Sequence, residues 1–219
     1  MQVLDNTPAL KVREIFLSLQ GESSRVGLPT VFVRLTGCPL RCVWCDTPYA
    51  FTGGQSMTVA QVVSQVSAYG VTNVCVTGGE PLAQAACLPL LSGLCDAGHS
   101  VALETSGALD IGAVDPRVAR VVDLKPPGSG ETRRNHWPNL SYLTRLDEVK
   151  FVLGNRADYE WSRQIITAHR LASVCSLLFS PVHGVLDDRT LAEWILADRL
   201  PVRFQLQLHK VLWGNIPGR

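Results

Sequence analysis

The chain has 219 residues, of which 46% are hydrophobic and 18% are charged, so it is long enough for a full core and too apolar to be disordered. Lysine plus arginine (20) nearly balance aspartate plus glutamate (19), which leaves a formal net charge of +1. This balance supplies no broad basic surface for nucleic acid and favours a small substrate. We expect a single domain over residues 1–219.

Membrane insertion and export are also disfavoured. The N-terminal region carries Asp5 and Lys11 and has no apolar signal core. The longest uncharged stretch, residues 81–95, is interrupted by Pro89 and Gly93, so no segment is expected to span a membrane. The cysteines number seven, and without an export signal they are expected to be free thiols in a reducing cytoplasm.

Strand and helix patterns alternate along most of the chain. Thr58 is a typical N-cap, and it precedes a helix with a valine stripe that Gly70 ends. A Leu- and Ala-rich helix is predicted to end near residue 94, and further helices are predicted at 157–171 and 187–198. The predicted strands cover residues 30–35, 74–77, 101–105, 120–124, 148–153, 176–179 and 203–208.

Repeated β–α units predict an α/β fold with a mainly parallel sheet. Six or seven such units favour a partial or distorted (β/α) barrel, and a doubly wound open sheet is the alternative. In both architectures ligands gather at the carboxyl ends of the strands, and the polar motifs of this chain follow predicted strands. The one long loop, residues 126–139, is either a flexible lid over the site or a plain connection.

Three cysteines, Cys38, Cys42 and Cys45, form the most informative motif. At this spacing they can bind three irons of a 4Fe–4S cluster and leave the fourth iron without a protein ligand. The next cysteine, Cys75, lies in an apolar predicted strand, so no fourth ligand follows nearby. An open iron is suited to chemistry on a bound molecule rather than to electron transfer alone.

Two other interpretations of the cysteines are weaker. A structural zinc site has four ligands, commonly in two pairs, and the five histidines lie too far along the chain for a clean pairing. Disulfides are disfavoured by the odd number of cysteines and by the absence of a secretory signal. An iron–sulfur cluster is therefore the favoured prediction.

The motifs together resemble the radical S-adenosylmethionine superfamily and, within it, the 7-carboxy-7-deazaguanine synthase family. The resemblance runs from about residue 12 to residue 213 and includes the cysteine-to-threonine step at Thr47. The family often has glycine where this chain has Ser23. The other marks are Leu19-Gln20-Gly21-Glu22, Arg34, Gly37, Thr77-Gly78-Gly79-Glu80-Pro81, Glu104-Thr105-Ser106-Gly107, Asp123-Leu124-Lys125 and Gln207-Leu208-His209-Lys210.

The resemblance implies a radical SAM fold in which the open iron binds the amino and carboxylate groups of S-adenosylmethionine. One electron from the cluster then breaks a carbon–sulfur bond and yields a 5′-deoxyadenosyl radical. Glycines would let the backbone approach the cofactor, and Glu80 would accept from its ammonium. The implied cofactor-binding residues are Gly79, Glu80, Ser106, Asp123, Leu124, Lys125, Ser180, Pro181, Val182 and His183.

Some of these residues also have ordinary structural explanations. A glycine pair after a strand is often only a turn, Lys125 can be a solvated charge at a strand end, and His183 alone is typical of a surface or core histidine. Trp44 within the cysteine loop is interpreted as packing around the cluster. The resemblance and the position after predicted strands favour the cofactor roles.

The implied substrate is 6-carboxy-5,6,7,8-tetrahydropterin, a flat heterocycle with one carboxylate. Arg34 is a fork of donors suited to that carboxylate, and the alternative for an arginine in an apolar strand is an internal salt bridge. Leu19, Gln20, Gly21 and Glu22 would bind the pterin edge, and Thr77 would add a hydroxyl contact.

Thr47 is the implied Mg²⁺ ligand. Mg²⁺ prefers oxygen ligands, keeps several waters and commonly joins a protein to its substrate through few contacts. Asp46 would assist directly or orient a water. The alternative is a turn at Thr47-Pro48 with no metal.

The implied activity is the conversion of the pterin to 7-carboxy-7-deazaguanine with loss of ammonia, as a step towards queuosine or a related deazapurine. A homodimer is usual in the resembling family, a flavodoxin is our hypothesis for the electron donor, and no direct contact with tRNA is expected. Two alternatives remain open from the sequence. One is an activase that places a glycyl radical on a partner protein, and the other is a non-catalytic iron–sulfur sensor or carrier.

Overall fold

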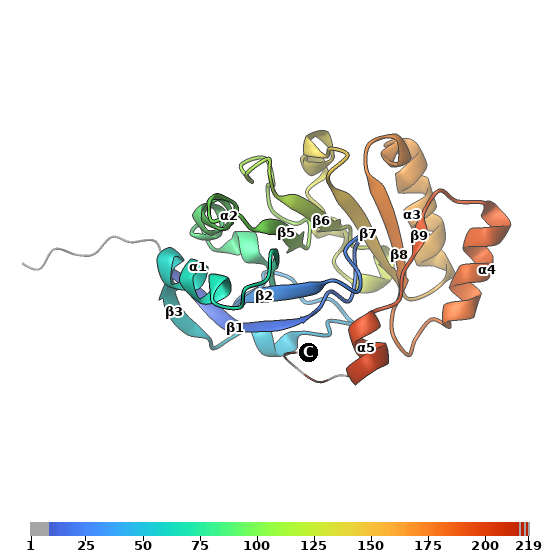
Figure 1. Cartoon of the computed structure of the whole chain (residues 1–219). Coiled ribbons are helices and arrows are strands. Elements are labelled where there is room, and N and C mark those ends of the chain that lie inside the picture. The colour runs from blue at the N-terminus through green and yellow to red at the C-terminus, as the bar shows by residue number, and fades with distance from the viewer. Residues whose placement is uncertain (1–8, 215, 217, 219) are drawn as a thin grey trace, which may run out of the picture.

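The computed structural model describes residues 9–214, 216 and 218, and its described strands form one sheet in the order β3-β1-β2-β4-β5-β6-β7-β8-β9 (Figure 1). In this order, every pair of neighbours from β2 and β4 through β8 and β9 is parallel. β1 pairs antiparallel with both β2 and β3. Because β3 and β9 are the two edges, the sheet is not closed. The predicted α/β fold, a partial or distorted barrel of six or seven mainly parallel strands, is confirmed as a mostly parallel sheet that does not close.

The seven parallel strands lie close to their predicted positions, but the two antiparallel ones were not predicted. A shift in register between Val12 and Glu14 interrupts the alternation of β1, and charged residues in this segment hide its strand character. The strands are β1 Ala9–Leu19, β2 Pro29–Leu35, β3 Gln55–Thr58, β4 Asn73–Gly78, β5 Ser100–Thr105, β6 Ala119–Asp123, β7 Glu148–Leu153, β8 Ser176–Pro181 and β9 Arg203–Phe204.

The helices are α1 Val59–Ser67, α2 Cys87–Asp96, α3 Arg156–Ala168, α4 Asp188–Asp198 and α5 Leu208–Trp213. Thr58 caps α1 through a capping box with Gln61, as its sequence predicts. Figure 1 shows α1 beside β3 and β1, α2 between α1 and β5, and α3 and α4 near the last parallel strands. Within the described part of the chain, none of the helices has the length and apolarity that crossing a membrane would require.

The strand predicted over residues 203–208 is wrong beyond Phe204. There the chain leaves the sheet, because the Gln205 side chain turns towards the loop after β1. Its amide accepts from the Ser23 N–H at 2.7 Å and donates to the Ser23 carbonyl at 2.8 Å. The following residues form α5 instead of more strand.

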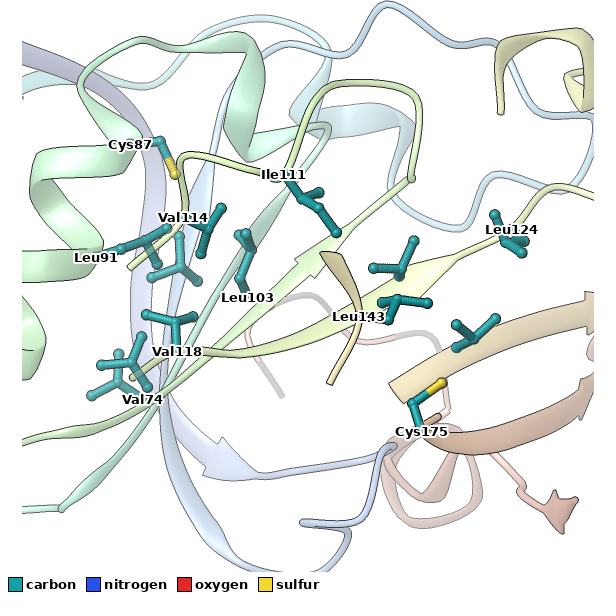
Figure 2. Close-up of a cluster of buried hydrophobic side chains, with 14 of the residues drawn as sticks. Val74, Cys87, Leu91, Leu103, Ile111, Val114, Val118, Leu124, Leu143 and Cys175 are labelled. Atoms are coloured by element: carbon teal, nitrogen blue, oxygen red, sulfur yellow. The ribbon is translucent and has the colours of Figure 1, made fainter. Parts of the chain in front are cut away.

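The core lies between the sheet and its covering helices. Figure 2 shows Leu91 of α2 near Val74 and Leu103, which belong to β4 and β5, and all three side chains are fully buried. Burying each such side chain contributes roughly 1.5–3 kcal/mol. This valine- and leucine-rich packing fixes the strands, and thereby the positions of the loops at their carboxyl ends.

Residues 126–139 form a fixed connection rather than a flexible lid. They contain short 3-10 turns, and Ser129 and Asn139 are fully buried. The Asn139 amide donates to the carbonyls of Gly107 and Leu109 and accepts from the Ile111 N–H. A segment whose buried polar groups are satisfied in this way has little freedom to open.

Candidate active site

One cavity of about 930 Å³ lies at the carboxyl ends of the parallel strands. Arg34 of β2, Thr77 of β4 and Asp123 of β6 line it, which agrees with the predicted place of the site. The other predicted residues that line it are Leu19, Gln20, Gly21, Glu22, Cys38, Cys42, Cys45, Thr47, Gly79, Ser106, Lys125, Val182 and His183. Four predicted residues do not line it, namely Glu80, Leu124, Ser180 and Pro181.

The cysteine loop is held against the cavity by residues 129–131. The Val43 N–H donates to the Ser129 carbonyl at 3.0 Å, and the Arg41 N–H donates to the Glu131 carboxylate at 2.5 Å. Burial raises the pKa of the Cys42 thiol, and the charge of nearby Lys125 opposes this. The loop therefore presents its thiols to the cavity with a cation beside one of them, which suits thiolate ligands.

The donor set fits an iron–sulfur cluster better than a single metal ion. Among the described residues, no three His, Cys, Asp or Glu side chains converge on one ion. A mononuclear zinc site needs such convergence, whereas a four-iron cluster binds each thiolate to a different iron. All three cysteines of the loop are free and partly exposed.

Trp44 packs against two glycines. A Cβ on Gly128 or Gly154 would lie 3.0 or 3.1 Å from the indole ring. The buried Asp158 carboxylate accepts from the N–H groups of both glycines, at 2.7 and 3.0 Å. Asp158 thereby joins the loop after β6 to the turn after β7 beneath the indole.

Gly78 and Gly79 are required by a close approach of the chain to itself. A Cβ on Gly79 would clash with the Gly37 carbonyl and lie 2.8 Å from Cys38 Cβ, and one on Gly78 would clash with the Leu35 backbone. The sequence interpretation assigned these glycines to close approach of a cofactor. The structure adds a second requirement for them, which is to let the cysteine loop cross the end of β4.

Glu80 lies outside the cavity and is fully buried. Its carboxylate accepts from the Thr105 hydroxyl, the Ser106 N–H and hydroxyl, and the Leu82 N–H. This position argues against the predicted contact with the cofactor ammonium, because the carboxylate is already satisfied by its own chain. Glu80 instead orients Ser106, which does line the cavity.

The other three predicted residues outside the cavity are buried behind it. Leu124 belongs to the hydrophobic core, and Pro181 ends β8. The Ser180 hydroxyl is buried with no hydrogen-bond partner among the described residues. These side chains support the strand ends, while the neighbouring Val182 and His183 reach the cavity.

Four alternating charges, Glu22, Lys150, Asp123 and Lys125, form a charged row along the cavity. Lys150 Nζ lies 2.6 Å from Glu22 Oε2 and 3.7 Å from Asp123 Oδ2, and Lys125 Nζ lies 3.0 Å from the same Asp123 oxygen. Burial would raise the pKa of the Glu22 carboxyl, but Lys150 outweighs it and holds that pKa below its usual range. Each group of the row therefore has a neighbour of opposite charge.

Two buried oxygens of the charged row have no hydrogen-bond partner in the part of the chain that the structure describes. Glu22 Oε1 and Asp123 Oδ1 are buried without a hydrogen bond among the described residues. A buried acceptor left unsatisfied costs roughly 1–3 kcal/mol, so hydrogen-bond donors of bound molecules are expected there. This supports the placement of ligands at both residues.

Arg34 makes the internal salt bridge that was its alternative interpretation, yet it also faces the cavity. Its Nε donates to Glu14 Oε1 at 2.7 Å, and the Tyr49 hydroxyl donates to the same oxygen at 2.9 Å. Hydrogen bonds among the described residues leave both terminal Nη nitrogens of Arg34 unused. The salt bridge with Glu14 therefore orients the guanidinium and leaves its two terminal nitrogens available for a ligand.

Glu104 organises two predicted substrate residues. Its carboxylate accepts from the Thr77 hydroxyl at 2.9 Å and from the Gln20 amide at 3.3 Å. Glu104 lines the cavity from β5. Glu104 belongs to a motif of the sequence, but its role was not predicted, because its position one strand from Thr77 cannot be derived from spacing alone.

The segment leading into α5 closes one side of the cavity. Gln207 Nε2 and Lys210 Nζ approach Asp46 Oδ2 at 3.1 and 3.2 Å, while the Thr47 hydroxyl donates to Asp46 Oδ1 at 2.9 Å. Burial disfavours the charge of Asp46, but Lys210, Thr47 and Gln207 hold the pKa of its carboxyl well below its usual range.

His209 packs directly on the Gln20–Glu22 motif. A Cβ on Gly21 would clash with the His209 ring, and the Leu208 N–H donates to the Gly21 carbonyl at 3.0 Å. Burial lowers the pKa of the His209 imidazole. Sequence reasoning quoted this segment but assigned no residue of it to the site. Residues 215, 217 and 219 of the tail lie outside the described residues.

Lys150 was also missed, although a signal for it exists. It lies in β7, whose other residues are apolar except Glu148. A lysine inside such a strand needs a buried partner, just as Arg34 does in β2. The position of Lys150 in the site could therefore have been predicted in the same way as that of Arg34.

Comparison with known proteins gives consistent matches. The Radical SAM superfamily model matches residues 32–195. A 7-carboxy-7-deazaguanine synthase of Chlorobaculum tepidum is 47% identical over 208 residues, with 94% of each chain covered, and one of Koribacter versatilis is 42% identical, with 93% of this chain and 97% of the relative covered. The chain belongs to the 7-carboxy-7-deazaguanine synthase family, within the radical SAM superfamily.

A solved structure agrees in fold with this member of the synthase family. The crystal structure of QueE from Escherichia coli covers 91% of this chain and 94% of its own, with a TM-score of 0.74 and 23% sequence identity. At this identity the likeness shows the fold alone. Membership of the superfamily implies a 4Fe–4S cluster and S-adenosylmethionine as cofactors, and the free cysteines on the cavity are suited to the cluster.

The glycine pair supplies a test of the cysteine loop. Gly79→Ala is expected to displace the loop, because the added Cβ has backbone on one side and cannot be accommodated by a side-chain rotation. Anaerobic reconstitution should then give less iron and sulfide per chain than wild type. The matched control is Gly93→Ala in α2, where the Cβ would meet Val59 and Val63 at an ordinary 3.6 Å, and full cluster content is expected. Equal cluster content in both variants would contradict this account of Gly79.

Proposed function

We propose that this chain converts 6-carboxy-5,6,7,8-tetrahydropterin to 7-carboxy-7-deazaguanine with release of ammonia. The observation that carries the proposal is that the cysteine loop and the residues suited to a carboxylated pterin face one cavity. Cys42, Arg34 and Glu22 come from separate parts of the chain and all line it. Family membership, with relatives of this name covering nearly the whole chain, supports the same reaction.

The cofactor half of the cavity lies at the ends of β4, β5 and β6. Cys38, Cys42 and Cys45 would hold the cluster, which with S-adenosylmethionine supplies the one-electron chemistry that removes a hydrogen atom from the substrate. Asp123 Oδ1 would accept from a hydroxyl or ammonium of S-adenosylmethionine, and Ser106 would add a second polar contact.

The substrate half lies between the loop after β1 and the end of β2. Glu22 Oε1 is a buried acceptor placed for a ring N–H, and the Gln20 amide, oriented by Glu104, would contact the amide-like edge of the pterin. The terminal nitrogens of Arg34 would bind the carboxylate. A pterin held by groups that are already oriented loses little further freedom when it reacts.

Magnesium is proposed at Thr47. The Thr47 hydroxyl lines the cavity beside the Asp46 carboxylate, so protein oxygens of the kind Mg²⁺ prefers are available. Asp46 is also paired with Lys210, so a water between Asp46 and the ion is the arrangement we favour. Substrate oxygens and water would complete the coordination.

The proposal extends to the surroundings of the enzyme. A single domain over residues 1–219 would work in a reducing cytoplasm, where free thiols and the cluster persist. A flavodoxin would supply the electron, and a homodimer would form as is usual in the family. The product would enter a route to queuosine or a related deazapurine, and the enzyme itself would not contact tRNA.

The decisive experiment is anaerobic turnover. Reconstituted protein with reductant, S-adenosylmethionine, Mg²⁺ and the carboxylated pterin should yield a new ultraviolet-absorbing deazapurine, identified by its mass. The control is Cys42→Ala, which should lose the brown colour, the iron and all product, because three cysteine ligands are needed to hold the cluster.

Other outcomes would favour the alternatives. Cleavage of S-adenosylmethionine without any deazapurine would favour a glycyl-radical activase. An electron paramagnetic resonance (EPR) spectrum of the reduced cluster that does not change on addition of S-adenosylmethionine would favour a sensor or carrier. A full cluster in Cys42→Ala would show that the ligand assignment is wrong.

Arg34→Ala should raise the KM for the pterin by roughly 10–100-fold, since a charge-assisted pair with a carboxylate contributes about 1.5–3 kcal/mol. Cleavage of S-adenosylmethionine should persist. Glu14→Gln is the matched control, because it removes the charge of the internal partner and keeps the arginine. If pterin binding is unchanged in Arg34→Ala, Arg34 serves only its internal salt bridge.

Thr47→Ala should slow turnover by roughly tenfold or more at saturating Mg²⁺, whereas Thr47→Ser, which keeps the hydroxyl, should retain most activity. Removal of divalent ions with a chelator should slow the wild type and have little further effect on Thr47→Ala. Equal wild-type rates with and without Mg²⁺ would rule out the metal site.

A further inference from the structure

Lys150 is a buried cation between the two halves of the cavity. It projects from β7, its side chain is only 11% exposed, and it lines the cavity. Its Nζ lies 2.6 Å from Glu22 Oε2, on the substrate side, and 3.7 Å from Asp123 Oδ2, on the cofactor side. One ammonium group therefore approaches a carboxylate of each ligand site.

The sheet fixes this arrangement. Asp123 and Lys150 are direct partners in the parallel register of β6 and β7, so their side chains project from the same face. Glu22 reaches Lys150 from the loop after β1, which is held over β7 by hydrogen bonds from Ser24 to Glu148. A lysine ammonium has three donors on a compact charge, which allows it to serve two carboxylates at once.

Lys150 approaches one oxygen of each carboxylate. The other oxygen of each carboxylate has no hydrogen-bond partner among the described residues. Glu22 is only 7% exposed, and its Oε1 has no hydrogen bond among the described residues. Asp123 Oδ1 is in the same condition, while both lysines of the charged row use Asp123 Oδ2. Lys150 donates a hydrogen bond to Glu22 Oε2 and, together with the nearer Lys125, attracts Asp123 Oδ2 by its charge. The other oxygen of each carboxylate therefore remains for a bound molecule.

We propose that Lys150 is a positioning residue shared by the two ligand sites. It fixes Glu22 for N–H donors of the pterin and Asp123 for hydroxyl or ammonium donors of S-adenosylmethionine. The identity of the pterin rests on the proposed function. Lys125 contacts Asp123 but no residue of the substrate side among the described ion pairs, so it is the natural control.

The test uses full-length, anaerobically reconstituted Lys150→Met. Affinity for S-adenosylmethionine is measured from the change that it causes in the EPR spectrum of the reduced cluster, and affinity for the pterin by equilibrium dialysis without reductant. Both dissociation constants should rise roughly tenfold or more, which is the effect expected for losing the orientation of a charged acceptor. The kcat at saturation should change by less than about threefold.

Lys125→Met should raise only the dissociation constant for S-adenosylmethionine and leave pterin binding within about twofold of wild type. A loss confined to one ligand in Lys150→Met would overturn the shared role. So would a lower kcat with both dissociation constants unchanged, because that is the signature of a purely structural lysine.

A second comparison keeps the test valid if the lone buried carboxylate prevents folding of Lys150→Met. The double variant Glu22→Gln/Lys150→Met removes the buried pair together, a change that proteins tolerate better than loss of one partner. It should bind S-adenosylmethionine more weakly than Glu22→Gln alone, which should match wild type within about twofold. Equal affinities in the two variants would overturn the proposal.

The wild-type turnover assay separates this inference from the proposed function. If wild-type protein forms no deazapurine, the proposed function fails. If that protein also does not bind the pterin, the shared role of Lys150 fails as well. If turnover occurs and only the Lys150 variants depart from expectation, the shared role fails alone, and the reaction assignment stands.

Discussion

The close approach of the ends of β2 and β4 determines where every other part of the site can lie. The Gly79 N–H donates to the Leu35 carbonyl at 3.1 Å, and the Glu80 N–H donates to the Gly37 carbonyl at 2.8 Å. Neither backbone could come so near if residues 78 and 79 carried side chains. The first cysteine therefore begins its loop at a fixed point of the sheet, before residues 129–131 hold the remainder in place.

The cavity tolerates many charges because nearly all of them are neutralised by their own chain. Asp46 is paired with Lys210, Arg34 is paired with Glu14, and Lys150 is placed between two carboxylates. Isolated charges at this depth would be strongly unfavourable. Among the described residues that line the cavity, the buried side-chain oxygens left without a hydrogen bond are Glu22 Oε1 and Asp123 Oδ1. A bound molecule with donors at these two places would complete hydrogen bonds that the fold leaves unmade.

The sequence was sufficient for features that depend on local pattern. The seven parallel strands and the Thr58 cap follow from runs of apolar residues and from capping chemistry. Features set by distant partners were missed or misassigned. β1 is a strand because β2 pairs with it across a bulge, Glu80 turns inward because Thr105 and Ser106 lie beside it, and residues after Phe204 leave the sheet because Gln205 has a partner near residue 23.

That last partner explains how the substrate side keeps its shape without glycine at residue 23. Ser23 has a φ of 70°, a left-handed conformation that costs a non-glycine residue about 1–2 kcal/mol. Gln205 both donates to and accepts from the Ser23 backbone, and two buried hydrogen bonds of about 1 kcal/mol each offset a strain of that size. The turn that presents Glu22 is thus held from the far end of the chain. It follows that the carboxyl-terminal segment supports the proposed substrate site through its packing on the loop after β1.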